Sequence, residues 1–340
     1  MDVVVVGGGM AGLVLARGLM LRGLRPVVLE RAPADATIPG PIMLPFQAYD
    51  PLAEIGLLDA IRARGLDIPP FQRGTPVAVG VGRQIVLDAL REGVDVRHGA
   101  EVVDLARDGD RVVGCVIRTA GGDAQTLPSD LMVGADGARS TVRGLAGFDA
   151  DVFAFDTAQL SWRSPVVPRE PFGIHFLPDG RQVTVVGWPG GAAGGWQIPR
   201  LEGGAHEATA AGFDEFRRRF ASLVPIAAEP LAAIGPADWF YREALGVRCD
   251  RWWRPGVALI GEALHAMNPE AGIGSGLGMG DAQALAVAVA RNPGDADAAC
   301  RDWEHWRRPA LAPYLAIGSE GVRVVRGGEP RPEEIWPPAP

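Results

Sequence analysis

The feature that most constrains this chain is a glycine-rich turn that follows a run of four valines. The run, Val3–Val6, is typical of a buried parallel strand, and residues 13–22 have helical spacing with no breaker before Gly23. A second apolar segment then ends at Glu30. Strand, turn, helix and strand within about 30 residues predict a βαβ unit, and therefore a parallel sheet covered by helices.

The glycines of this turn have the spacing of a dinucleotide-binding fingerprint. Gly7, Gly9 and Gly12 permit a tight turn and a close approach of backbone N–H groups to a diphosphate, which the helix N-terminus faces. Glu30, eighteen residues after Gly12, can accept hydrogen bonds from ribose hydroxyls. We therefore prefer a dinucleotide site to a plain glycine turn, and both FAD and NAD fit at this point.

Two later segments distinguish between FAD and NAD. Residues 133–143 read VGADGARSTVR, and residues 259–269 read LIGEALHAMNP ahead of a glycine-rich stretch. Together with the first glycine turn, these segments resemble the class A flavoprotein monooxygenases, the para-hydroxybenzoate hydroxylase-like aromatic hydroxylases. The resemblance covers most of residues 1–150 and 250–290, and it is specific because three separated motifs occur in the right order.

The resemblance implies a set of cofactor-binding residues along the chain: Gly7, Gly9, Gly12, Glu30, Arg83, Asp136, Gly137, Gly261, Glu262, Gly272, Gly274 and Gly276. The first four would hold the ADP half of FAD, and Arg83 would lie near the phosphates or the ribityl chain. The Asp136–Gly137 pair would contact FAD and the nicotinamide nucleotide. Glu262 and its preceding glycine would hold ribityl hydroxyls. The last three glycines would bring backbone amides to the flavin pyrimidine edge, ahead of a helix predicted over residues 281–290.

Two residues are candidates for the reacting side of the flavin. By the resemblance, Pro269 would line the reactive face. His175 alternates with apolar residues in FGIHFL, so it could face substrate as a general base if that strand covers the flavin. Placement in the core or on the surface is the alternative. We expect His265 to order a loop rather than to act as a base.

The chain departs from the family pattern at three places. The family's aspartate is Glu262 here, and the usual glutamine and asparagine of the glycine loop are Ile273 and Gly276. The arginine that often follows the ribose acid by about ten residues is missing, by comparison with the same family. These departures bear on flavin movement and on the kinetics of flavin reduction.

The pattern changes from about Phe153, where short β-like segments and then an amphipathic helix appear. We predict an α/β protein: a Rossmann-type FAD-binding domain of residues 1–153 and 251–326, with an inserted mixed β-sheet substrate domain of residues 154–250. Further helices follow at the C-terminal end. Residues 327–340 are rich in proline, which predicts a mobile tail.

Composition excludes several classes of function. A net charge of −8 argues against nucleic acid or an anionic membrane as a partner. The 33 basic residues are all arginine, which removes Schiff-base chemistry and the P-loop lysine. Three cysteines without a CxxC motif make a metal site or a disulfide framework improbable and favour the cytoplasm. We expect no signal peptide and no membrane span.

These observations imply an FAD-dependent monooxygenase, monomeric or homodimeric. NAD(P)H would reduce the flavin, and O2 would add at flavin C4a. The C4a-hydroperoxide would then pass an oxygen atom to a small aromatic or phenolic substrate. A flavin-dependent reductase or dehydrogenase of the same fold and a non-catalytic flavin-binding protein stay open as alternatives. A flavin-dependent halogenase is disfavoured because its chemistry relies on a lysine.

Overall fold

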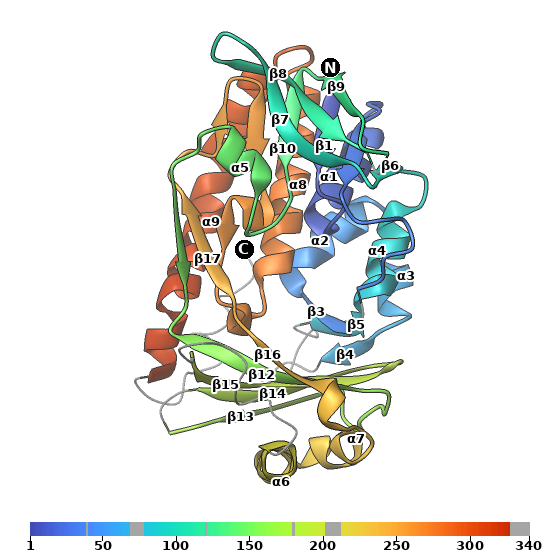
Figure 1. The fold of residues 1–340 in the computed structure, drawn as a ribbon, viewed down its shortest axis with the longest axis vertical. Coiled ribbons are helices and arrows are strands. Elements are labelled where there is room, and N and C mark those ends of the chain that lie inside the picture. Colours follow the sequence, from blue (N-terminus) through green and yellow to red (C-terminus); the bar gives the residue numbers. More distant parts are fainter. Residues whose placement is uncertain (39, 69–77, 120, 179–180, 201–211, 327–340) are drawn as a thin grey trace.

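The computed structural model describes residues 1–38, 40–68, 78–119, 121–178, 181–200 and 212–326 (Figure 1). Its helices are α1 (Met10–Met20), α2 (Tyr49–Glu54), α3 (Leu58–Arg62), α4 (Arg83–Arg91), α5 (Thr141–Leu145), α6 (Phe213–Leu223), α7 (Ala228–Ala232), α8 (Gly274–Arg291) and α9 (Ala296–Arg326), with short 3-10 turns η1 (Phe46–Ala48), η3 (Pro225–Ala227), η5 (Gly261–Ala263) and η6 (Pro269–Ala271). The predicted tail, residues 327–340, lies outside the described residues.

A six-stranded, mostly parallel sheet forms the upper body in Figure 1, in the order β18-β19-β10-β1-β2-β6. These strands are β1 (Val3–Val6), β2 (Val27–Glu30), β6 (Asp95–His98), β10 (Leu131–Gly134), β18 (Trp253–Arg254) and β19 (Val257–Leu259). Strand β1 is buried along its whole length because it is paired on both sides. Helix α1 packs against β1 and β2, and α8 packs against α1. This is the predicted βαβ arrangement.

An antiparallel sheet, β13-β14-β15-β12-β16, lies at the other end of the molecule (Figure 1). Its strands are β12 (Thr157–Ser164), β13 (Phe172–Phe176), β14 (Gln182–Trp188), β15 (Gly191–Pro199) and β16 (Trp239–Arg242). Its outer face carries a second hydrophobic core with α6 and α7, in which Trp162 and Phe220 are fully buried. The inner face points toward the end of the molecule that holds the parallel sheet. This face forms the floor of a cavity.

Three smaller sheets complete the fold, and their strands are β3 (Pro41–Pro45), β4 (Leu66–Ile68), β5 (Ala78–Gly82), β7 (Glu101–Asp108), β8 (Arg111–Arg118), β9 (Ala124–Pro128), β11 (Ala150–Ala154), β17 (Leu245–Cys249) and β20 (His265–Ala266). Strands β11 and β17 pair with each other, close to the boundaries predicted for the inserted domain. The mixed α/β fold class is confirmed, while the division into domains stays a prediction.

Helix α8 differs from its prediction because it begins at Gly274, seven residues before the predicted start. Glycine is a poor helix former, so packing must favour the helix here. A Cβ at Gly278 would lie 3.1 Å from the Cα of Gly261, and one at Gly280 would lie 2.7 Å from the Arg307 guanidinium. The glycines therefore let α8 approach η5 and α9 more closely than a larger residue would allow.

Candidate active site

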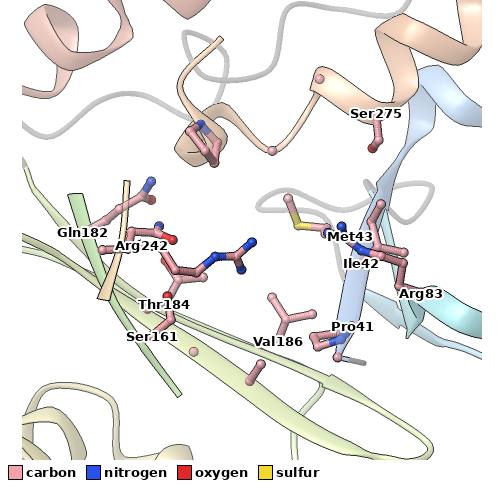
Figure 2. Close-up of a pocket in the computed structure, with 18 of the residues that line it drawn as sticks. Pro41, Ile42, Met43, Arg83, Ser161, Gln182, Thr184, Val186, Arg242 and Ser275 are labelled. Atoms are coloured by element: carbon pink, nitrogen blue, oxygen red, sulfur yellow. The ribbon is translucent and has the colours of Figure 1, made fainter. Parts of the chain in front are cut away.

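A cavity of about 620 Å³ lies between the inner face of the antiparallel sheet and the segment that precedes α8. Strand β3 and the start of α4 close one side of it (Figure 2). The wall includes Arg83, Glu262, Pro269, Gly272 and Gly274, five of the residues predicted for the site. The structure therefore brings together residues that are up to 191 positions apart in the sequence.

Alternation along the strands decides which side chains form the cavity floor. From β13 the cavity is lined by Phe172, Ile174 and Phe176, and from β14 by Gln182, Thr184 and Val186. His175 is not among the lining residues, which corrects its prediction as a residue that faces substrate. It shares a face of β13 with Gly173, where a Cβ would meet Ile226 at 2.6 Å on the opposite side of the sheet.

The cavity wall is rich in positive charge. Arg83, Arg163 and Arg242 line it, and Glu262 is the one acidic residue among the described residues of the lining. Figure 2 shows Arg242 extending from the sheet toward the side on which Arg83 lies. Burial lowers the pKa of Arg83, the charge of Arg242 lowers it further, and Glu262 opposes both effects. The two facing guanidinium groups favour an anionic ligand between them.

The first glycine turn lies outside this cavity wall, at the start of α1. Gly7 has a φ of +113°, and a Cβ on it would lie 2.4 Å from the carbonyl oxygen of Ala135. A Cβ on Gly12 would lie 2.1 Å from the carbonyl oxygen of Gly7. Gly9 is exposed and has open space around it. The turn is thus closed on its inner side and open on the side from which a diphosphate would approach.

Helix α1 has no side-chain cap, so the N–H groups of its first turn can bind an anion. Glu30 accepts hydrogen bonds from the backbone N–H groups of Gly8 and Ala32, both at 2.8 Å. These bonds hold the carboxylate beside the turn, and its contact with a ribose stays a prediction. The open turn and the uncapped helix fit the diphosphate of a dinucleotide.

The Asp136–Gly137 pair is also outside the cavity wall, and Asp136 orders the start of α5. Its carboxylate accepts from the backbone N–H of Thr141 at 2.7 Å and from the hydroxyl of Ser140. Arg143 is buried and donates to the carbonyl oxygen of Ala263, the residue after Glu262. The motif therefore joins α5 to the cavity wall, and its contact with the cofactors stays a prediction.

The remaining predicted glycines have distinct surroundings. Gly261 has a φ of +57°, and its N–H donates to Asp281 at 3.0 Å. Gly276 is buried against β3 and η1, where a Cβ would lie 2.9 Å from both Pro45 and Gln47. The structure thus gives Gly276 a packing role, and the approach of its amide to the flavin stays a prediction. Gly272, with a φ of +67°, does line the cavity.

A buried charge network behind the cavity was missed by sequence reasoning. Asp281 is fully buried, lies 2.6 Å from Nε2 of His265 and accepts from Nε of Arg307 at 2.8 Å. Burial raises the pKa of Asp281, but the opposing effects of His265 and Arg307 are larger and lower it to about 2. An aspartate within a stretch of small and apolar residues was the available signal, but its partners come from distant segments.

The described residues also bear on metal binding and on membrane crossing. In that part of the chain, no cluster of three or more His, Cys, Asp or Glu side chains could hold a metal ion. Within the same described ranges, no helix combines the length and the apolar character needed to cross a membrane.

Comparison with known proteins agrees with this geometry. The family model "FAD binding domain" matches residues 1–73 and 80–311. The chain is 29% identical to 6-methylpretetramide 4-monooxygenase of Streptomyces rimosus, over 79% of this chain and 70% of that protein. It is 30% identical to the ubiquinone hydroxylase UbiL of Rhodospirillum rubrum, over 95% of this chain and 81% of the relative.

A solved structure has the same fold. HpxO of Klebsiella pneumoniae, complexed with FAD and uric acid, superposes with a TM-score of 0.78 at 22% identity, covering 99% of this chain and 91% of that one. The open glycine turn, the cavity beside α8 and these matches all indicate the same family. The chain belongs to the FAD-binding-domain family of flavoprotein monooxygenases.

Proposed function

We propose that this protein transfers one oxygen atom from O2 to a small aromatic or phenolic substrate, with NAD(P)H as electron donor. The observation that carries the proposal is the cavity. Its floor is the inner face of the antiparallel sheet, and its opposite wall holds Pro269, Gly272 and Gly274, which by the resemblance would lie against the flavin. The two relatives, a 6-methylpretetramide 4-monooxygenase and a ubiquinone hydroxylase, support the transfer of one oxygen atom to an organic substrate.

FAD, when bound, would supply the redox chemistry that activates O2. The protein's own contribution is binding and orientation. The N-terminus of α1 and the turn around Gly9 would hold the diphosphate. Glu262, which is exposed on the cavity wall, would accept hydrogen bonds from the ribityl hydroxyls. Gly272 and Gly274 would let backbone lie against a flat ring, because neither carries a side chain.

The cavity would position the substrate and keep water away from the reacting atoms. Its floor supplies apolar contacts from Ile174, Val186 and Phe240 and hydroxyl groups from Ser161 and Thr184. Pro269 is exposed on the opposite wall, consistent with its predicted place at the reactive face of the flavin. The described part of the floor offers no histidine, so a general base, if the reaction needs one, must be sought elsewhere than His175.

The proposed setting is the cytoplasm. Cys115, Cys249 and Cys300 are all free and buried, which fits a reducing compartment. Burial raises the pKa of Cys115 and of Cys249 to about 11, so neither thiol is disposed to react near neutral pH.

The test uses the purified protein with saturating FAD. NADH or NADPH oxidation is measured against a library of phenols and aromatic acids, and products are analysed by mass spectrometry under isotopically labelled O2. We expect one product that gains one labelled oxygen atom. Turnover without oxygen transfer would indicate a reductase or dehydrogenase. Bound FAD with no turnover for any compound would indicate a non-catalytic flavin-binding protein.

A further inference from the structure

Two methionine side chains reach the cavity that is proposed to activate O2. The cysteines are free and buried, which keeps their thiols away from an oxidant. Two of the seven methionines, Met43 and Met267, line the cavity. The methionines outside its lining are Met1, Met10, Met20, Met132 and Met279. A thioether is soft and polarizable, and it is readily oxidised when an oxidant can reach it.

The two cavity methionines are held differently. Met267 packs against the hydrophobic core around the parallel sheet, and its Cγ would lie 3.7 Å from a Cβ at Gly274. Among the described residues, Met43 is half-buried and packs against neither of the two hydrophobic cores. Figure 2 shows its side chain extending from β3 into the cavity. The thioether of Met43 is therefore the less enclosed of the two.

Strand register agrees with this orientation. Met43 on β3 pairs with Gly80 on β5, and directly paired residues point to the same face of a sheet. A Cβ at Gly80 would lie 3.2 Å from Cγ1 of Val186, which is part of the cavity floor. The face of β3 that carries Met43 thus points toward the sheet on which the substrate is proposed to lie.

Strand β3 also contacts the segment that the resemblance assigns to the flavin. Pro45 lies two residues after Met43, so alternation along the strand places both on one face. A Cβ at Gly276, in the first turn of α8, would lie 2.9 Å from Cγ of Pro45. Gly272 and Gly274 line the same cavity as Met43. Met43 therefore lies where the wall proposed to hold the flavin meets the floor proposed to hold the substrate.

A thioether can take the place of an organic oxygen acceptor. Its sulfur lone pair attacks one oxygen atom of activated O2, the O–O bond breaks, and the other oxygen atom leaves as water. One thioether, one O2, two electrons and two protons thus give one sulfoxide and one water. NAD(P)H and one proton supply the two electrons and the two protons. The sulfur is oxidised and O2 is reduced, with the same stoichiometry as the proposed oxygen transfer to substrate.

We propose that Met43 is an internal oxygen acceptor of this enzyme. When O2 is activated while no substrate occupies the cavity, one oxygen atom passes to the Met43 sulfur and forms methionine sulfoxide. This inference rests on the proposed function. A sulfoxide is polar where a thioether is apolar, and it would lie at the wall that is proposed to contact the cofactor. Oxidation of Met43 would therefore weaken FAD binding.

The experiment uses the FAD-loaded enzyme without substrate. The flavin is reduced anaerobically in the dark with one equivalent of dithionite, the protein is mixed with O2, and the cycle is repeated in the presence of catalase. Peptide mass spectrometry gives the fraction of each methionine that gains an oxygen atom. We expect Met43 to be modified about tenfold more than Met20, because the oxidant is formed beside Met43. Met43 should also exceed Met267, which packs against the core.

One treatment and two variants locate the oxygen acceptor. Hydrogen peroxide added to the oxidised enzyme should reverse the order, with Met20 modified before Met43, because Met20 is 40% exposed. Met43→Leu nearly conserves side-chain volume, so it should keep the fold and gain no oxygen atom at position 43. Met267→Leu is the matched change in the same cavity and should leave the modification of Met43 unchanged.

FAD affinity is a second readout that does not depend on turnover. Modified parent protein should bind FAD about threefold or more weakly, because a polar group placed against an apolar contact costs free energy. Met43→Leu taken through the same cycles should keep its starting affinity. Flavin fluorescence gives both dissociation constants. An unchanged affinity in the modified parent would contradict the place of Met43 beside the cofactor.

Other results would overturn the inference. These are an unmodified Met43 after cycling, a modification no greater than that of Met20, or one that occurs only when catalase is left out. The last result would assign the oxygen atom to released hydrogen peroxide. Oxygen transfer to a library compound together with an unmodified Met43 would refute this inference alone. Modified Met43 in an enzyme that transfers oxygen to no library compound would support it and refute the proposed substrate class.

Discussion

Glu262 combines an unusual residue for its position with exposure on the cavity wall. It follows a buried strand, and its carboxylate faces a wall that also carries Arg83. A carboxylate at this position can accept hydrogen bonds from a ligand chain that carries hydroxyl groups and lies over it. Glutamate reaches about one carbon–carbon bond farther than the family's aspartate, so the contact can be made with the backbone slightly farther away.

We expect Glu262→Ala to weaken FAD binding by about 10- to 100-fold, the equivalent of one charge-assisted hydrogen bond. Glu262→Asp should weaken it less, because a water molecule can bridge the shorter side chain. Flavin fluorescence gives the dissociation constants. Glu243→Ala removes an exposed carboxylate outside the cavity lining and is the matched control. Unchanged binding in Glu262→Ala would mean that the carboxylate has no part in holding the cofactor.

At the scale of elements, the glycine turn before α1 has two kinds of glycine. Gly12 is in contact with the backbone of the turn itself, whereas Gly9 faces open space with an ordinary φ of −80°. A methyl group at Gly12 must disturb the protein even without ligand. A methyl group at Gly9 is tolerated by the protein and would meet only an incoming diphosphate.

The two glycines should therefore respond differently to alanine. Gly12→Ala is expected to lower both the melting temperature of the FAD-free protein and FAD occupancy, because its Cβ would lie 2.1 Å from the Gly7 carbonyl oxygen. Gly9→Ala should leave the melting temperature of the FAD-free protein within about one degree, as for a surface change, and reduce FAD affinity alone. Differential scanning calorimetry and flavin titration measure both quantities. Full FAD affinity in Gly9→Ala would show that the diphosphate does not approach this turn.

At the scale of the whole molecule, one buried carboxylate connects three distant segments. Asp281 of α8 contacts His265 beside the cavity, Arg307 of α9 and the N–H of Gly261. Arg307 also donates to the carbonyl oxygen of Leu277 at 2.8 Å. The network fixes α9 against α8 and holds the loop that carries Glu262.

Asp281→Asn should lower the free energy of unfolding at pH 7 by about 3–5 kcal/mol, because a buried charge loses its partner. The pKa of Asp281 is lowered to about 2, from a value near 4 when unfolded. Its ionic contribution is thus complete above about pH 4 and is lost as the pH falls toward 2. Urea unfolding at one FAD concentration should show parent and variant converging over that range. A constant difference contradicts the assignment, and Asp110→Asn, an exposed change, is the control.

The βαβ unit and the glycine turn could be predicted because their causes are local. Four consecutive valines favour a buried strand, and the glycine spacing is needed wherever a turn joins such a strand tightly to a helix. The flavoprotein family could be recognised for the same reason, since its motifs are short contiguous segments. Sequence also indicated that His265 orders a loop, which agrees with its bond to Asp281.

By itself, then, the sequence determined the fold class and the cofactor, and the segments that would surround the cofactor stay a prediction. Only the tertiary structure decided which face of β13 carries His175, that α8 begins among the glycines, and which groups surround Asp281. It also decided that Arg242 and Gln159 are neighbours in paired strands and that both line the cavity. These outcomes depend on register and packing between distant segments, and a shift of one residue in a strand moves every side chain to the other face.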